Sequence, residues 1–191
     1  MTVDGMDVET RRTMPLAEQS ARPGGWLGRH AALGLTTSLA VAAVDQASKL
    51  WLLFVFELGS RGLVPVVPSL VLVLTWNTGI SYGLFPQNTE LGRWLLLALQ
   101  AGAILGLGIW MLRAPARLTV VALGLIVGGA VGNIIDRLAY GAVADFVFFH
   151  VDFGSWEFRW YIFNLADAAV VAGVVGLVYE SLFARNAAKA P

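Results

Sequence analysis

The sequence contains no cysteine and only two histidines among its 191 residues. Without cysteine there are no disulfides, thiol nucleophiles or thiolate metal ligands. No H-E-x-x-H motif occurs, and His30 and His150 lie far apart in the chain, which argues against a zinc peptidase. We therefore predict neither a metal site nor a cofactor.

Charged residues are also scarce, at 14% of the chain, against about a quarter in an average soluble domain. The 13 basic and 13 acidic side chains cancel, which argues against a nucleic-acid partner because such a partner requires a basic surface. Hydrophobic residues make up 57% of the chain. This composition predicts one compact domain embedded in membrane lipid.

Four apolar stretches are long enough to cross a bilayer, which takes about 20 residues in a helix. The shorter apolar run over residues 63–76 contains two prolines and many β-branched residues, so we predict a surface strand there and not a fifth helix. The expected fold class is an all-α membrane protein with four transmembrane helices. The predicted parts are an N-terminal extension, cytoplasmic and disordered, over 1–30, spans near 31–56, 94–112, 118–135 and 160–182, an outer β-rich segment over 57–92, and a cytoplasmic tail over 183–191.

Basic residues concentrate on one side of these spans. They precede the first span, fill the loop between the second and third with Arg113 and Arg117, and follow the fourth. The positive-inside rule then places both termini in the cytoplasm. Glycines four residues apart also predict close helix packing, at the pairs Gly102 and Gly106, Gly124 and Gly128, and Gly128 and Gly132.

Several polar residues lie within or beside the spans, where a charge costs roughly 2.5–3.5 kcal/mol at the bilayer centre. Asp45 and Lys49 are four residues apart and are expected to pair. Asp136 is expected to pair with Arg137. From the direction of each span, the polar residues should converge near the outer leaflet, with Asp167 about 10 Å inside the membrane at ~1.5 Å per residue.

Two further aspartates, Asp145 and Asp167, have no basic neighbour in helical register. Two carboxylates in one apolar site can share a proton, so that one serves as a base and the other as an acid. Aspartic proteases use this arrangement to activate water against a peptide carbonyl. The spacing alone makes this one hypothesis among several.

Two alternatives stay open from the residues. The run Gly79-Ile80-Ser81-Tyr82-Gly83 matches G-x-S-x-G, the pattern around a nucleophilic serine. Loop-like residues follow it, which favours a simple turn. A small proton- or ion-coupled transporter would also use buried carboxylates. It would need polar groups at several depths, whereas the inner halves of the last three spans hold few besides Gln100.

Five blocks in order resemble the lipoprotein signal peptidases, also called signal peptidase II. The resemblance extends from about Gly34 to Leu182. The blocks are Asp45-Gln46-Ala47-Ser48-Lys49, Asn77-Thr78-Gly79, residues 128–137 (GGAVGNIIDR), Val143-Ala144-Asp145-Phe146, and Phe163-Asn164-Leu165-Ala166-Asp167-Ala168.

The resemblance implies four transmembrane helices with a small extracytoplasmic β-rich cradle. It implies that Asp145 and Asp167 are the catalytic pair, with polar support from Asn133, Arg137 and Asn164. Other signature positions match Asp45, Lys49, Asn77, Gly128, Gly129, Asp136 and Ala168.

The function that the resemblance implies is removal of signal peptides from diacylglyceryl-modified prolipoproteins, by cleavage before the lipidated cysteine. The enzyme would lie in the bacterial cytoplasmic membrane with its active site toward the outer leaflet. Globomycin-type peptides would inhibit it.

Overall fold

The computed structural model describes residues 27–79 and 90–184. Most of the predicted N-terminal extension lies outside these ranges, as do Ser81 and most of the predicted C-terminal tail.

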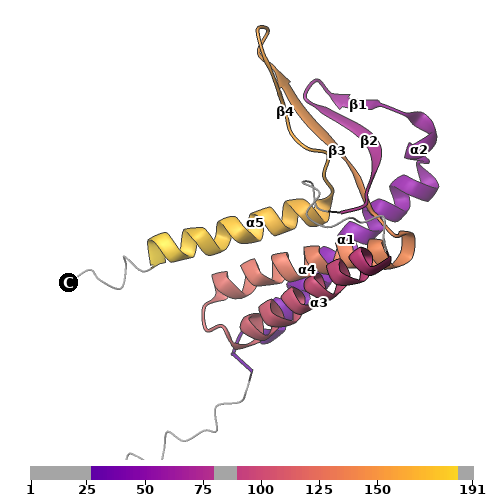
Figure 1. The fold of residues 1–191 in the computed structure, drawn as a ribbon. Coiled ribbons are helices and arrows are strands. Elements are labelled where there is room, and N and C mark those ends of the chain that lie inside the picture. The colour runs from indigo at the N-terminus through magenta and orange to yellow at the C-terminus, as the bar shows by residue number, and fades with distance from the viewer. Residues whose placement is uncertain (1–26, 80–89, 185–191) are drawn as a thin grey trace, which may run out of the picture.

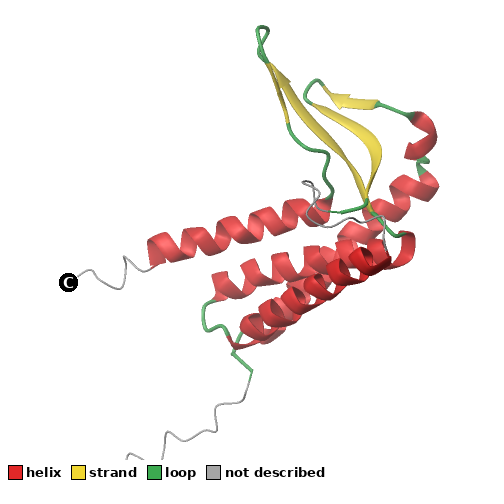
Figure 2. Ribbon diagram, viewed as in Figure 1, coloured by secondary structure: helices red, strands yellow, loops and turns green. Residues whose placement is uncertain are grey.

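Four long helices dominate the structure (Figures 1 and 2). Each is long and apolar enough to cross a membrane, so the predicted number of spans is confirmed for the part of the chain that the structure describes. A short helix, α2 (Leu58–Arg61), follows the first of them. The long helices are α1 (Ala31–Leu50), extended by a π-helical turn (Trp51–Val55), α3 (Glu90–Arg113), α4 (Arg117–Tyr140) and α5 (Leu165–Tyr179), extended by a second π-helical turn (Glu180–Ala184).

The predicted bounds of the third and fourth spans are wrong. Helix α4 runs to Tyr140, five residues beyond the predicted end, and so includes Asp136 and Arg137. Helix α5 begins five residues late, because the backbone of Trp160 and Phe163 is hydrogen-bonded to strand residues. Asp167 therefore lies in the first turn of α5 and not two turns inside it, which corrects its predicted place in the helix.

Helix α4 is the centre of the bundle and packs against α1, α3 and α5. In α4, 56% of the most apolar segment is buried, against 11–22% in the other spans. Its glycines allow this contact, since a Cβ on Gly128 would lie 2.5 Å from the carbonyl oxygen of Ser38, and one on Gly129 would overlap that of Ala166.

The glycine prediction for α4 is thus confirmed, but the one for Gly102 and Gly106 is wrong. A Cβ at either of these α3 positions would have no described atom within 4 Å. Glycine spacing alone does not distinguish a helix face that meets another helix from one that does not.

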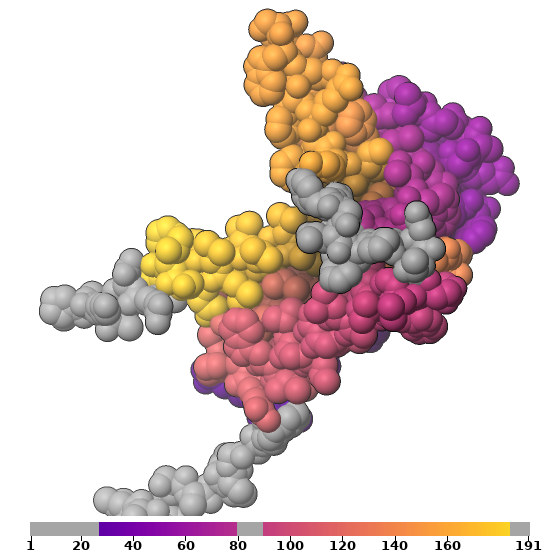
Figure 3. All heavy atoms as spheres, in the orientation of Figure 1, coloured from indigo at the N-terminus to yellow at the C-terminus, as the bar shows by residue number. Residues whose placement is uncertain are grey.

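A four-stranded antiparallel sheet projects from one end of the helices (Figures 1 and 3). The strand predicted within residues 63–76 is present. The strands over residues 143–152 and 157–159 were not predicted, because the first of them pairs with a strand about 70 residues earlier in the chain. In order, the strands are β1 (Val64–Val67), β2 (Leu70–Asn77), β3 (Val143–Asp152) and β4 (Glu157–Arg159).

One face of the sheet packs on the C-terminal end of the first span and on α2. Phe146 of β3 is buried there with Leu52 and Leu58. Because successive side chains of a strand point to opposite faces, the neighbouring Asp145 is directed away from this apolar cluster.

Candidate active site

Asp145 is held at the start of strand β3. Its backbone is opposite Thr75 in the ladder with β2, and the side-chain amide of Asn77 donates to its Oδ2 at 3.0 Å. The side chain is only 3% exposed. Burial raises the pKa of the Asp145 carboxyl above its usual value, while the hydrogen bond from Asn77 opposes that shift.

Asp167 is held by the start of helix α5. Asn164 is the N-cap, and its side chain accepts from the backbone N–H of Asp167 at 2.9 Å. In return, Oδ2 of Asp167 accepts from the backbone N–H of Asn164 at 3.2 Å. This reciprocal capping box fixes the carboxylate over the helix N-terminus, where the helix dipole favours negative charge.

Two asparagines join the aspartates into one network. Asn164 is fully buried, and its Nδ2 donates to Oδ1 of Asp145 at 2.6 Å and to Oδ1 of Asn133 at 3.1 Å. Nδ2 of Asn133 donates to Oδ1 of Asp167 at 2.8 Å. Each oxygen of the two carboxylates thus accepts a hydrogen bond. The structure brings these residues together as the sequence predicts.

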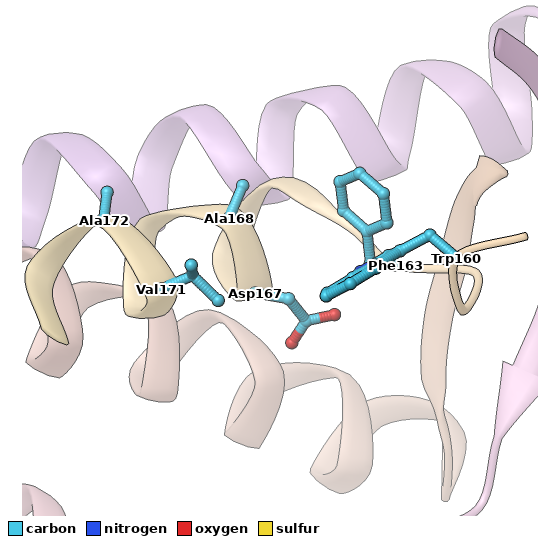
Figure 4. Close-up of a pocket in the computed structure, with 6 residues that line it drawn as sticks. All are labelled: Trp160, Phe163, Asp167, Ala168, Val171 and Ala172. Carbon is cyan, nitrogen blue, oxygen red and sulfur yellow. The ribbon is translucent and has the colours of Figure 1, made fainter. Parts of the chain in front are cut away.

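Asp167 opens onto a cavity of about 360 Å³. Its carboxylate projects from α5 beside the indole of Trp160 (Figure 4). The remaining lining is Phe163, Ala168, Val171 and Ala172. Asp145 is buried and is not among the residues that line this cavity, so of the two carboxylates the cavity borders that of Asp167.

Most of the residues that line this cavity were not predicted from the sequence. Asp167 and Ala168 were predicted site residues, whereas Trp160 and Val171 were not. The spacing of Asp167, Ala168, Val171 and Ala172, at i, i+1, i+4 and i+5, marks one face of a helix. This spacing could have been recognised in the sequence if the start of α5 had been predicted correctly.

Lys49 pairs with two buried acids. Its Nζ lies 2.7 Å from Oδ2 of Asp45 and 2.8 Å from Oδ2 of Asp136. The predicted pair of Asp45 with Lys49 is confirmed. The predicted pair of Asp136 with Arg137 is wrong, because consecutive helical side chains point in different directions.

Arg137 instead contacts the backbone of its own helix. Its guanidinium donates to the carbonyl oxygen of Asn133 at 3.5 Å and lies in the electrostatic field of Asp167 and Asp145. Arg93 of α3, which the sequence analysis did not name, donates to the carbonyl oxygen of Arg137 at 3.2 Å. Gly128 and Gly129 lie at the helix contacts described above.

Gln46 is a second polar residue that the sequence analysis did not assign to the site. Its amide donates to Oδ1 of Asp136 at 2.8 Å and to the carbonyl oxygen of Gly132 at 3.0 Å. Its place between Asp45 and Lys49 in one motif block was the available signal. Among the described residues, no three histidine or acidic side chains are placed to hold a metal ion.

Known proteins of one family are similar to this chain over most of its length. The family model described as signal peptidase (SPase) II matches residues 37–183. A lipoprotein signal peptidase of Nitrobacter hamburgensis is 56% identical over 158 residues, which cover 83% of this chain and 96% of the relative. One of Methylorubrum extorquens is also 56% identical, over 83% of this chain and 89% of the relative.

Two solved structures, each described as a bacterial membrane enzyme, share the fold. One has a TM-score of 0.66 and covers 80% of this chain and 94% of the solved one. The other has a TM-score of 0.62 and covers 83% and 92%. Both are 23% identical to this chain, so they support the fold alone. The family match over most of the chain and the close relatives establish the enzyme class: the chain belongs to the signal peptidase II family of aspartic-type membrane peptidases.

Proposed function

We propose that Asp145 and Asp167 are the catalytic pair with which this enzyme removes signal peptides from lipid-modified prolipoproteins. The observation that carries the proposal is their joint attachment to Asn164. One amide group binds Asp145, while the same residue caps the helix turn that holds Asp167. Two carboxylates so linked can share one proton.

The reaction needs one water molecule and this shared proton. The ionised carboxylate removes a proton from water as the oxygen attacks the peptide carbonyl, and the protonated carboxyl donates to the carbonyl oxygen. Proton transfer to the leaving nitrogen then breaks the C–N bond. The flanking asparagines fix the orientation of both carboxylates without supplying a charge of their own.

The cavity beside Asp167 suits an apolar substrate. Trp160, Phe163 and Val171 present hydrocarbon and aromatic surface to it, and such lining is typical of sites that bury most of a ligand. A signal peptide and the diacylglycerol of a prolipoprotein are both apolar, and cleavage falls before the lipidated cysteine. Globomycin-type peptides would compete for the same site.

The membrane orientation that fits this function places the sheet outside the cytoplasm. Arg113 and Arg117 end and begin the two helices at the opposite end of the bundle. The turn between β3 and β4 and the segment after β4 carry exposed aromatic residues, among them Trp156 and Tyr161, as expected at a membrane–water interface. Both termini are then cytoplasmic and the site is near the outer leaflet of a bacterial membrane.

The test is release of the signal peptide from a diacylglyceryl-modified prolipoprotein by the reconstituted enzyme. Asp145→Asn and Asp167→Asn should each abolish release, whereas Ser81→Ala should retain most of it. Activity near that of the wild type in either Asn variant would disprove the proposed pair. Loss of activity in the Ser81 variant alone would favour a serine mechanism.

A further inference from the structure

Lys49 lies between two buried carboxylates with all its donors in use. Its ammonium group contacts Asp45 at 2.7 Å and Asp136 at 2.8 Å, and it donates to Oδ1 of Asn133 at 3.2 Å. The exposed fractions of Lys49, Asp45 and Asp136 are 1%, 0% and 0%. An ammonium group has three hydrogens. We call these three charged residues the Lys49 clamp.

Each acid of the clamp also binds a backbone N–H next to a proposed catalytic aspartate. Oδ1 of Asp45 accepts from Ala166, the residue before Asp167, at 2.9 Å. Oδ2 of Asp136 accepts from Ala144, the residue before Asp145, at 3.1 Å. The two acids thus hold equivalent points of α5 and β3, and Lys49 ties the acids to one another.

A second bridge reinforces this connection. Nε2 of Gln46 contacts Oδ1 of Asp136 at 2.8 Å and Oδ2 of Asp45 at 3.3 Å. Gly132 leaves room for the Asp45 carboxylate in this bridge, because a Cβ at position 132 would lie 2.5 Å from Oδ2 of Asp45. The clamp is therefore a closed network of donors and acceptors that joins α1, α4, α5 and β3.

Stability alone does not account for such a network. Replacing buried ion pairs with apolar residues of similar size often leaves a protein equally stable or more stable, so burial of three charges needs another explanation. The hydrogen bonds to Ala144 and Ala166 provide one, because they fix two backbone segments that carry reacting groups.

We propose that the Lys49 clamp is a positioning device that sets the separation of the Asp145 and Asp167 carboxylates. This proposal rests on the catalytic role proposed above for the two aspartates. Lys49, Asp45 and Asp136 are positioning residues that do not touch the substrate. Their effect is large because a misplacement of about 1 Å in a reacting group can lower the rate by about 100-fold.

The test compares two replacements at each acid. Asp136→Asn and Asp45→Asn remove the charge but keep an oxygen that can accept the backbone N–H. Asp136→Leu and Asp45→Leu remove both at a similar size. We expect kcat to fall by about 10-fold in the Asn variants and by about 100-fold or more in the Leu variants, with KM within about twofold of the wild type.

Lys49→Met tests the link between the acids. It keeps the length of the side chain but removes the charge that joins Asp45 to Asp136, so kcat should again fall by about 100-fold with little change in KM. Thermal melting in detergent measures folding of each variant. Leu123→Ala is the matched control, since Leu123 is fully buried in α4; it should lower the melting temperature and leave kcat unchanged below that temperature.

Each outcome decides for or against the clamp. If folded Lys49→Met keeps a kcat within twofold of the wild type, or if the Asn and Leu variants lose activity only through KM, the proposal is overturned. If the Leu variants do not fold, Lys49→Met and the Asn variants decide it by the same criterion. If Lys49→Met does not fold either, the Asn variants alone decide it. Activity in Asp145→Asn would instead refute the proposed catalytic pair, which separates the two failures.

Discussion

The side-chain amide of Asn164 donates to Oδ1 of Asp145 at 2.6 Å, and the carbonyl oxygen of the same side chain accepts from the backbone of Asp167. One buried residue thus acts as a helix cap and as an orienting group for both carboxylates. This double role makes it the most informative single position next to the proposed catalytic pair.

Asn164→Ala should reduce activity much more than stability. Loss of an N-cap costs about 1 kcal/mol, whereas loss of the bridge frees Asp145 and the first turn of α5 together. We expect kcat for signal-peptide release to fall by about 100-fold or more, and the melting temperature to fall by only a few degrees. A variant that melts well below the wild type but is fully active when folded would contradict this expectation.

The stability of the enzyme should depend on the ionisation of Asp145. Burial raises the pKa of this carboxyl in the folded state, so the folded state binds a proton that the unfolded state releases. Stability is then lost as the pH rises through the interval between the ordinary Asp pKa of about 3.9 and the raised value.

Asp145→Asn removes this titration. Relative to that variant, the wild type should therefore melt at progressively lower temperature as the pH increases above about 4, until the raised pKa is passed. Melting in detergent across this range checks the sign. A difference between the two melting temperatures that is constant with pH, or that changes in the opposite direction, would show that Asp145 does not titrate in this way.

Most of this site could be predicted from the sequence, because its members occur at helical spacings or in recognisable blocks. Asp45 with Lys49, and Asn164 with Asp167, follow from spacing alone. The place of Asp145 in the site does not follow from spacing, because it depends on the pairing of β3 with a strand about 70 residues earlier. The partner of Asp136 was mispredicted for a similar reason, because Lys49 lies on another helix.

The helix bounds could not be predicted from hydropathy either. Residues 160–163 are hydrophobic and adjoin the span, but the backbone N–H groups of Trp160 and Phe163 donate to carbonyl oxygens of β3. The Asn164 cap marks the start of α5, and a search for an N-cap with an acid three residues later would have found it. The glycines of α3 and α4 are alike in spacing, and only the packed structure distinguishes them.

Gly129→Ala should disrupt the contact between α4 and α5. The added Cβ would overlap the backbone carbonyl of Ala166, which cannot move without displacing the adjacent Asp167. Overpacking of this kind costs about 1–3 kcal/mol, and we expect signal-peptide release to fall with it. Melting temperature and kcat report the two effects separately.

Gly102→Ala is the control for this substitution. It adds the same methyl group to a helix at a position with no described atom within 4 Å, and alanine favours a helix over glycine by about 0.5–1 kcal/mol. The variant should be fully active and at least as stable as the wild type. If both alanine variants behave alike, the close contact at Gly129 does not explain any change in melting temperature or kcat.

Ala168→Leu should close the cavity beside Asp167. The larger side chain would fill part of the cavity next to the Asp167 carboxylate, and the proposed substrate needs this space. We therefore expect kcat/KM to fall by about 10-fold or more. Folding should be unaffected because Ala168 lies at the surface of α5. Val175→Leu, on the same helix at a position that is 61% exposed, is the matched control and should retain wild-type kinetics.

The proposed orientation can be tested directly, because the chain has no cysteine of its own. Ser155→Cys introduces a thiol at the turn between β3 and β4, and Pro115→Cys introduces one in the loop between α3 and α4. If the sheet lies outside the cytoplasm, a membrane-impermeant maleimide added to intact spheroplasts should label the Ser155 variant alone. The Pro115 variant should react only after the membrane is opened, since its thiol would be on the cytoplasmic side with the basic residues. The reverse pattern would place the aspartates near the inner leaflet and contradict the proposed access of a substrate from the outer one.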